Sequence, residues 1–160
     1  MKIHAFAAKA PKGKLEPFAY EAGPLKANEV DIEVTHCGIC HSDVHMIDND
    51  WRMASFPLVP GHDVIGRVAE AGSAVQHLKK GDRVGVGWQS SSCGTCEWCL
   101  KGMETCCSQI EGVIVGRHGG FADRVRANAR FVLPIPDALD SAAAAPLLCG
   151  GITVYNPLRR

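Results

Sequence analysis

The chain has 160 residues, a typical size for one domain, and its 17 lysines and arginines balance 17 aspartates and glutamates. A neutral chain with 6% aromatic residues offers no basic or stacking surface for nucleic acid, and 46% hydrophobic residues exclude a disordered chain. The 17 glycines and nine prolines favour short strands joined by turns. We therefore expect a mainly β fold with few short helices.

The longest apolar run, residues 142–152, is shorter than the roughly 18 residues that would suggest a membrane span. His4 and Lys9 interrupt the apolar region that a signal peptide would need, so residues 3–7 are predicted to form a first strand. We expect a cytoplasmic protein with no membrane partner. In that reducing compartment, clustered cysteines indicate metal binding rather than disulfides.

The next elements follow from alternation and turn residues. Residues 30–34 alternate apolar and polar side chains, which predicts a strand with one buried face. Ser42 is placed to cap a short helical turn that follows this strand. Pro60 and Gly61 form a turn that would deliver His62 to the start of a strand at residues 64–68.

The second half of the chain is predicted to hold short strands around a long loop. Residues 88–112 contain most of the cysteines and show little periodicity, so they are expected to form a zinc-binding lobe on a β body. Asp140 or Ser141 would cap a helix over residues 142–148. The predicted strands of this half are residues 84–86, 113–115, 121–125 and 131–133.

The spacing of the clustered cysteines predicts a structural zinc site. Zinc in such a site takes four ligands in a tetrahedron, and two-residue gaps let a tight turn present successive sulfurs to one ion. Four thiolates would leave no position for a substrate. From spacing alone, either Cys106 or Cys107 could be the fourth ligand, after the first three, which are Cys93, Cys96 and Cys99.

A second set of metal-binding side chains is scattered through the sequence. Cys40, His62 and Cys149 each stand beside a turn or glycine, but each alone is ambiguous, because single cysteines are usually core residues. His41 and His45 form a competing pair, since residues four apart share one face of a helix.

Five segments together resemble a known family. The chain is similar to the N-terminal catalytic domain of zinc-dependent, medium-chain alcohol dehydrogenases, and most similar to their cinnamyl-alcohol-dehydrogenase-like, NADP-preferring branch. This resemblance covers essentially residues 1–160 and implies a GroES-like, partly open β-barrel. The segments are CGICHSDVH at 37–45, PGHDVIG at 60–66, GDRVGVG at 81–87, CGTCEWC at 93–99 and LLCGGITVY at 147–155.

The resemblance assigns two zinc ions per chain. It makes Cys40, His62 and Cys149 the ligands of a catalytic zinc with one open position, where an alcohol would lose its proton and release hydride to a nicotinamide. It implies a structural zinc on Cys93, Cys96, Cys99 and Cys107.

Further roles come from the same resemblance. Asp43 would fix the ring of His62, Ser42 would pass the substrate's proton outward, and His41 would lie near the coenzyme phosphates. Asp63 departs from the glutamate usual after the histidine, which leaves its role open. Trp88 replaces a smaller residue and is interpreted as packing in the zinc lobe rather than as a substrate contact.

Cys37 and Cys106 are left without a role in either zinc site. We expect them to be core or loop thiols.

The sequence contains no G-x-G-x-x-G fingerprint of a nucleotide-binding domain; the nearest segment, residues 85–90, leads into the cysteine loop. We therefore expect a catalytic domain that reversibly oxidises a primary alcohol to an aldehyde with NADP(H), but only together with a coenzyme domain. The alternative is a zinc-binding interaction module or subunit without dehydrogenase activity; a co-chaperonin is disfavoured, because that role needs no metal. Apolar residues of helix 142–148 are expected to favour self-association.

Overall fold

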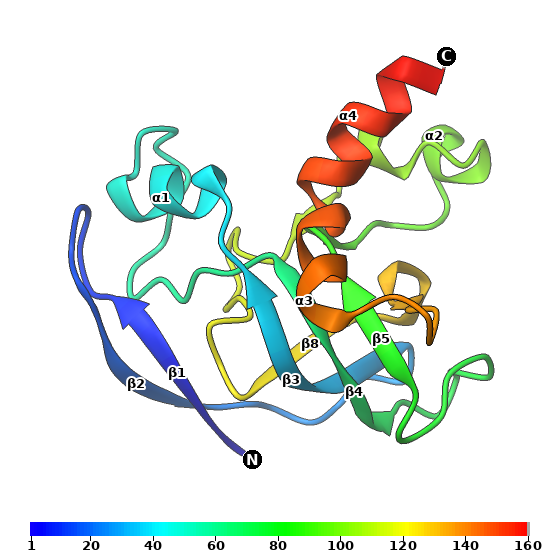
Figure 1. The fold of residues 1–160 in the computed structure, drawn as a ribbon, viewed down its shortest axis with the longest axis horizontal. Coiled ribbons are helices and arrows are strands. Elements are labelled where there is room, and N and C mark those ends of the chain that lie inside the picture. The colour runs from blue at the N-terminus through cyan, green and yellow to red at the C-terminus, as the bar shows by residue number, and fades with distance from the viewer. Residues whose placement is uncertain (160) are drawn as a thin grey trace.

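The computed structural model describes residues 1–159, and its centre is a five-stranded antiparallel sheet in the order β8-β3-β4-β5-β9 (Figure 1). Residues that alternate along β3 and β4, such as Val30, Ile32, Val64 and Val68, are buried in the main core. The mainly β fold is thereby confirmed. The strands are β3 (Glu29–Gly38), β4 (Asp63–Ala71), β5 (Arg83–Val86), β8 (Arg124–Asn128) and β9 (Leu133–Pro134).

A two-stranded hairpin of β1 (Lys2–Ala8) and β2 (Leu15–Glu21) lies beside this sheet (Figure 1). Main-chain hydrogen bonds attach it to the body, with Phe6 N donating to Phe121 O at 2.8 Å and Ala8 N to Leu58 O at 2.9 Å. The predicted first strand is confirmed. The strand β2 was not expected, because none of its residues is fully buried and its sequence has little apolar patterning.

The first helix, α1 (His41–Asp48), begins three residues after β3 ends at Gly38, and its N-cap is Cys40. The expectation that Ser42 caps this helix is wrong, since Ser42 lies inside the first turn. The side chain of Asp43 takes over capping, because its Oδ2 accepts a hydrogen bond from Cys40 N at 3.0 Å. The helix therefore starts at the residue after Cys40, which lies two residues beyond the end of β3.

Three short helical segments close the chain. Asp140 caps α3 (Ser141–Ala144) by accepting hydrogen bonds from Ala142 N and Ala143 N, as expected. The 3₁₀ helix η3 (Ala145–Leu148) follows, because Pro146 lacks the N–H that would continue α3. The predicted helix over 142–148 is thus split into α3 and η3. The last helix, α4 (Gly150–Arg159), follows them toward the C-terminus (Figure 1).

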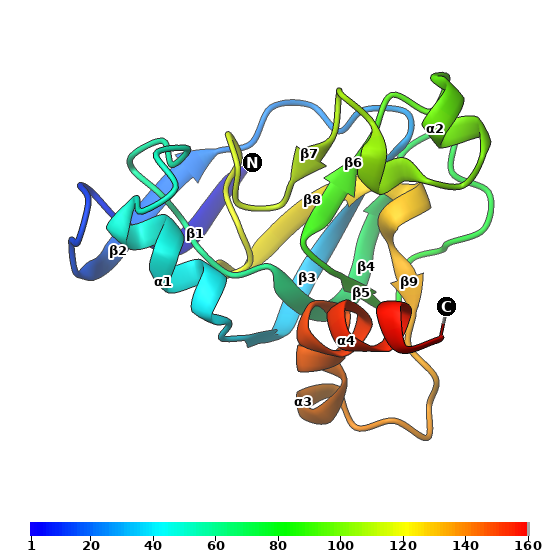
Figure 2. The same ribbon diagram turned by 90° about the horizontal axis from the view of Figure 1, so that it is seen from above.

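Residues 88–112 form a lobe at one end of the sheet, as Figure 2 shows. The lobe contains a small sheet of β6 (Gln89–Ser91) and β7 (Glu111–Gly112), the short helix α2 (Glu97–Leu100) and the 3₁₀ helix η1 (Glu104–Cys106). An ion pair from Arg130 Nη2 to Glu104 Oε1, 2.9 Å long, ties it to the body.

Three predicted strands are wrong or displaced. Residues 113–115 form turns rather than a strand. Residues 121–123 leave the main sheet to contact β1, so β8 begins only at Arg124. Residues 129–131 form the 3₁₀ helix η2 (Ala129–Phe131), which shortens the last strand to β9.

Within residues 1–159, the strands form separate sheets rather than a closed barrel. No helix of this part is long and apolar enough to cross a bilayer.

Candidate zinc sites

Three residues far apart in the sequence converge where β3, β4 and the C-terminal helices meet. Cys40 caps α1, His62 stands directly before β4, and Cys149 lies between η3 and α4. Their ligand atoms all lie within 4.8 Å of one another, and the two sulfurs are 4.0 Å apart. Two thiolates on one tetrahedral zinc, each with a bond of about 2.3 Å, lie about 3.8 Å apart. The three side chains therefore fit one zinc ion.

Asp43 orients the histidine of this cluster. Its Oδ1 lies 2.8 Å from His62 Nδ1 and also accepts a hydrogen bond from Gly61 N at 2.8 Å. Both side chains are 2% exposed, so water does not compete for this contact. With Nδ1 donating to the carboxylate, the lone pair of Nε2 is directed to the metal position.

Without a metal, His62 and Cys149 hold protons that a bound cation would displace. Burial alone would lower the pKa of His62, but the hydrogen bond and charge of Asp43 raise it to about 9. Burial and the neighbouring Cys40 raise the pKa of Cys149 to about 12, while hydrogen bonds from Ser42 and His62 outweigh burial and lower the pKa of Cys40. Crowded thiols beside a buried histidine lose their protons readily only when a cation neutralises them.

A cavity of 360 Å³ opens onto this cluster. His62 and Cys149 line it, together with the hydroxyl-bearing side chains of Ser42 and Thr153. The rest of its lining is apolar: Met46, Trp51, Met53, Trp88, Gly112, Ile114 and Val115. Trp88 lines this cavity, which its interpretation as lobe packing did not predict.

The second metal cluster lies in the lobe. The sulfurs of Cys93, Cys96, Cys99 and Cys107 all lie within 4.8 Å of one another. Cys93 Sγ lies 3.9 Å from Cys99 Sγ and 3.6 Å from Cys107 Sγ, again close to the separation expected around zinc. The structure brings Cys107 into the cluster and leaves Cys106 exposed, which favours Cys107 as the fourth ligand.

Backbone N–H groups point at the sulfurs of this lobe. Cys96 N donates to Cys93 Sγ and Gln109 N to Cys107 Sγ, each at 3.3 Å. The backbone contacts of Thr95 and Cys96 lower the pKa of Cys93 to about 6. Such contacts stabilise thiolate, the form that binds metal. All four residues fit a closed tetrahedral site.

The histidine pair on α1 stands apart from the first cluster. The rings of His41 and His45 lie 4.7 Å apart, and His45 Nδ1 contacts Asp50 Oδ2 at 2.7 Å. No third ligand joins them within the described residues. His41 is exposed on the first turn of α1, and its assignment to the coenzyme stays a prediction.

Asp63 is buried, and its Oδ1 lies 4.0 Å from His62 Nε2 without a hydrogen-bond partner among residues 1–159. An unpartnered buried carboxylate on the Nε2 side of the histidine is consistent with a cation at the cluster.

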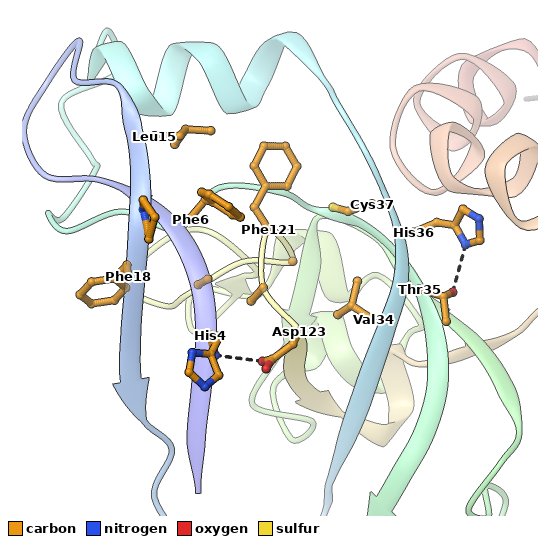
Figure 3. A pocket seen from close by; sticks show the side chains of 14 residues that line it. His4, Phe6, Leu15, Phe18, Val34, Thr35, His36, Cys37, Phe121 and Asp123 are labelled. Carbon is orange, nitrogen blue, oxygen red and sulfur yellow. Dashed lines mark hydrogen bonds between the residues drawn. The ribbon is translucent and has the colours of Figure 1, made fainter.

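Cys37 belongs to neither cluster. It lines a different cavity, of 710 Å³, between the β1–β2 hairpin and β3, where Phe6, Phe18 and Phe121 gather (Figure 3). Burial raises the pKa of Cys37 to about 12, so its thiol stays protonated.

Several residues that line the 360 Å³ cavity were not predicted from the sequence: Trp51, Met53, Ile114, Val115 and Thr153. They lie on loops and on α4, where neither periodicity nor metal spacing could single them out.

The comparisons identify the family. Residues 26–137 match the model of the alcohol dehydrogenase GroES-like domain. The chain belongs to this family, whose members include zinc-binding alcohol dehydrogenases.

Two curated relatives are informative. The chain is 53% identical to aldehyde reductase AdhA of Synechocystis sp. over 98% of its length, and 42% identical to a probable mannitol dehydrogenase of Fragaria ananassa over 99%. The match spans 46% of each relative, so the chain covers about half the length of these proteins.

Solved structures agree in fold. Cinnamyl alcohol dehydrogenase 4 of Sorghum bicolor superposes with a TM-score of 0.94 at 39% identity, over 99% of this chain and 48% of that one. The cinnamyl alcohol dehydrogenase of Helicobacter pylori, complexed with NADP(H), gives a TM-score of 0.95 at 28% identity, over 99% and 48% of the two chains. The chain thus matches the N-terminal half of the cinnamyl-alcohol-dehydrogenase-like branch.

Proposed function

We propose that the chain is the zinc-binding catalytic domain of an alcohol dehydrogenase, which reversibly oxidises a primary alcohol to an aldehyde with NADP(H) when joined to a coenzyme domain. One observation carries this proposal: Cys40, His62 and Cys149 converge at an apolar cavity, with three protein ligands and room for a substrate beside them. The names of the relatives support the reaction class.

The chain's own residues divide the work at this site. Zinc, when bound, supplies a Lewis acid that lowers the pKa of an alcohol. Cys40 and Cys149 hold the metal with two thiolates, and Asp43 fixes the ring of His62 so that Nε2 binds. Ser42 lines the cavity, and its Oγ would receive the alcohol's proton. The apolar walls exclude water from the developing hydride donor.

A structural zinc is proposed for the lobe, held by Cys93, Cys96, Cys99 and Cys107, which gives two zinc ions per chain. Its four thiolates leave no open position, so this ion would order residues 88–112 instead of binding substrate.

The coenzyme and the compartment follow from the same proposal. The exposed imidazole of His41 would contact coenzyme phosphates, and NADP(H) is favoured by the branch of the family that the chain resembles. A reducing cytoplasm would keep both groups of thiols available as ligands.

A chimera tests the function. The chain would replace the matched N-terminal half of the Synechocystis relative, to which it is 53% identical. We expect zinc-dependent reduction of aldehydes with NADPH, abolished by Cys40→Ala and retained by Cys106→Ala, whose exposed thiol lies outside both clusters. A folded chimera with two zinc ions and no turnover would contradict the proposal and favour the interaction module.

A further inference from the structure

Two histidines of α1 form a pair of metal-binding side chains that neither zinc cluster uses. His41 and His45 are four residues apart, so their side chains leave the helix on the same face, one turn from each other. Their ring centroids lie 4.7 Å apart, with the ring planes at 71°. His41 is exposed, and the side chain of His45 is 36% exposed, so an ion from the solvent can reach both rings.

The separation of the two rings suits imidazoles that share one ion. A metal–nitrogen bond of about 2.1 Å places each ring centroid about 3.2 Å from the ion, so two imidazoles at neighbouring coordination positions have centroids about 4.5 to 5 Å apart. The centroid distance between His41 and His45 falls in this range. Rotation about the side-chain bonds is then enough to direct one nitrogen of each ring to the same ion, while the helix backbone stays in place.

Asp50 fixes the tautomer and the orientation of His45. Its Oδ2 lies 2.7 Å from His45 Nδ1, and a carboxylate can only accept a hydrogen bond, so the neutral ring carries its proton on Nδ1 and its lone pair on Nε2. Trp51 packs against the same ring, with centroids 5.0 Å apart at a tilt of 34°. Asp50 therefore orients His45 in the way that Asp43 orients His62, through a carboxylate–histidine contact that is typical of metal-binding histidines.

The chemistry of the ligands indicates which ions fit. Imidazole nitrogen suits Cu²⁺, Ni²⁺ and Zn²⁺, whereas Mg²⁺ and Ca²⁺ prefer oxygen ligands. Asp48, three residues after His45, lies on the same face of α1, and Asp50 lies directly beyond the end of the helix. Their negative charges favour a cation beside the two rings.

We propose that His41 and His45 form an accessory site for a divalent transition-metal ion, with one nitrogen from each ring as ligand and water in the remaining positions. The helix holds the second imidazole beside the first, so the second metal–nitrogen bond forms within one molecule and costs little additional entropy. With two protein ligands at an exposed position, the site exchanges its ion with the solvent. It is independent of the proposed function, because both of its ligands lie outside the two zinc clusters.

Ni²⁺ is the probe for this site, because it binds imidazole, does not oxidise thiols and broadens nearby resonances in nuclear magnetic resonance spectra. The chain is prepared without a histidine tag and loaded with zinc before the titration. We expect Ni²⁺ to broaden the ring signals of His41 and His45 first and in a saturable way. The signals of His36, which is exposed on β3, and of His77, whose ring contacts Ala129 O, should keep their width. Mg²⁺ at the same concentrations should broaden none of them.

Variants measure the contribution of each side chain. His41→Gln and His45→Gln should each weaken Ni²⁺ binding about 100-fold, because a single imidazole loses the gain from joining two ligands in one frame. Asp50→Asn should weaken it about tenfold by removing the charge that orients His45. His36→Gln removes an exposed histidine without a partner one turn away and should leave the affinity unchanged. Full affinity in either α1 histidine variant, or an equal loss in His36→Gln, would overturn the proposal.

Zinc analysis during the titration separates the accessory site from the zinc clusters. A zinc content that stays constant while His41 and His45 broaden supports the accessory site, because Ni²⁺ then binds without replacing zinc. If zinc is released in step with Ni²⁺ uptake and both signals stay sharp, the proposal fails and the zinc clusters stand. A folded chain that holds no zinc but binds Ni²⁺ through His41 and His45 would contradict the proposed function and support the accessory site.

Discussion

Asp43 connects three segments through one carboxylate: Oδ1 contacts the ring of His62 and the N–H of Gly61, and Oδ2 receives the N–H of Cys40. The same side chain therefore caps α1 and positions two of the three candidate ligands. Buried polar networks of this kind depend on every member being satisfied.

Replacing Asp43 by Asn should weaken zinc at the Cys40 site by about 10- to 100-fold, because the amide loses the charge that holds the His62 tautomer. Competition with a chelator measures the affinity, and the lobe zinc should be unaffected. Asp137→Asn changes an exposed carboxylate and serves as the control. Equal affinities for the two variants would show that Asp43 acts only as a helix cap.

The adjacent cysteines of the lobe give a second prediction. Cys107→Ser should lower the zinc content from two ions per chain to one and loosen residues 88–112, because the metal contributes much of the folding energy of such a segment. Cys106→Ser should keep two zinc ions, since its side chain is exposed. Elemental analysis of both purified variants decides the matter; the reverse result would place the fourth ligand at Cys106.

At the scale of elements, the turn before β4 determines where His62 points. Gly61 has a φ of +96°, and a Cβ there would lie 2.5 Å from Phe121 Cδ1 and 2.8 Å from Cys37 Sγ. Gly81 has a similar φ of +92° but open space around its Cβ position. Both glycines therefore have a positive φ, but only at Gly61 would an added Cβ collide with neighbouring atoms.

Gly81→Ala should therefore destabilise the fold by about 1 to 2 kcal/mol through backbone strain alone. Gly61→Ala should lose about 1 to 3 kcal/mol more, because it also overpacks the site. Denaturant unfolding of the zinc-loaded variants gives both values. Equal losses would mean that the surroundings of Gly61 move aside freely.

Elements with a clear local signal could be predicted from the sequence, and elements made by tertiary contacts could not. The strand at residues 30–34 and the turn at 60–61 have alternation and Pro-Gly chemistry of their own. Residues 121–123 are apolar enough to predict a strand, but contacts with β1 draw them away from the main sheet.

The same limit applies to the site. The spacing of the lobe cysteines predicts a zinc site, but only three-dimensional placement distinguishes Cys107, which lies with the other three sulfurs, from the exposed Cys106. Trp51 could not be predicted as a cavity residue, since its position depends on left-handed backbone at Asn49 and Arg52.

At the scale of the whole molecule, α4 exposes several large apolar side chains. None of its residues is buried, and its exposed side chains include Ile152, Val154, Tyr155 and Leu158. The expected apolar surface therefore lies mainly on α4, beyond the predicted helix at 142–148.

We expect the chain to self-associate with rising concentration, because a contiguous apolar face favours burial. The double variant Ile152→Glu, Leu158→Glu should shift it toward monomer in sedimentation velocity. Leu100→Glu charges a residue of α2 that is 75% exposed and should leave the association unchanged. A monomeric chain at all concentrations, or equal effects of both changes, would exclude α4 as the contact surface.

The described residues also lack the element that binds a dinucleotide. Residues 85–90, the nearest approach to a glycine fingerprint, run from β5 into β6, whereas a pyrophosphate site needs a glycine turn that opens a helix. The zinc cluster alone then has no hydride acceptor beside it. Titration of the 160-residue chain with NADPH, followed by fluorescence, should show no saturable binding below the millimolar range, while the chimera with the remaining part of the Synechocystis relative should bind it. A micromolar dissociation constant for the chain alone, lost in His41→Ala, would show that α1 recruits the coenzyme without a nucleotide-binding domain.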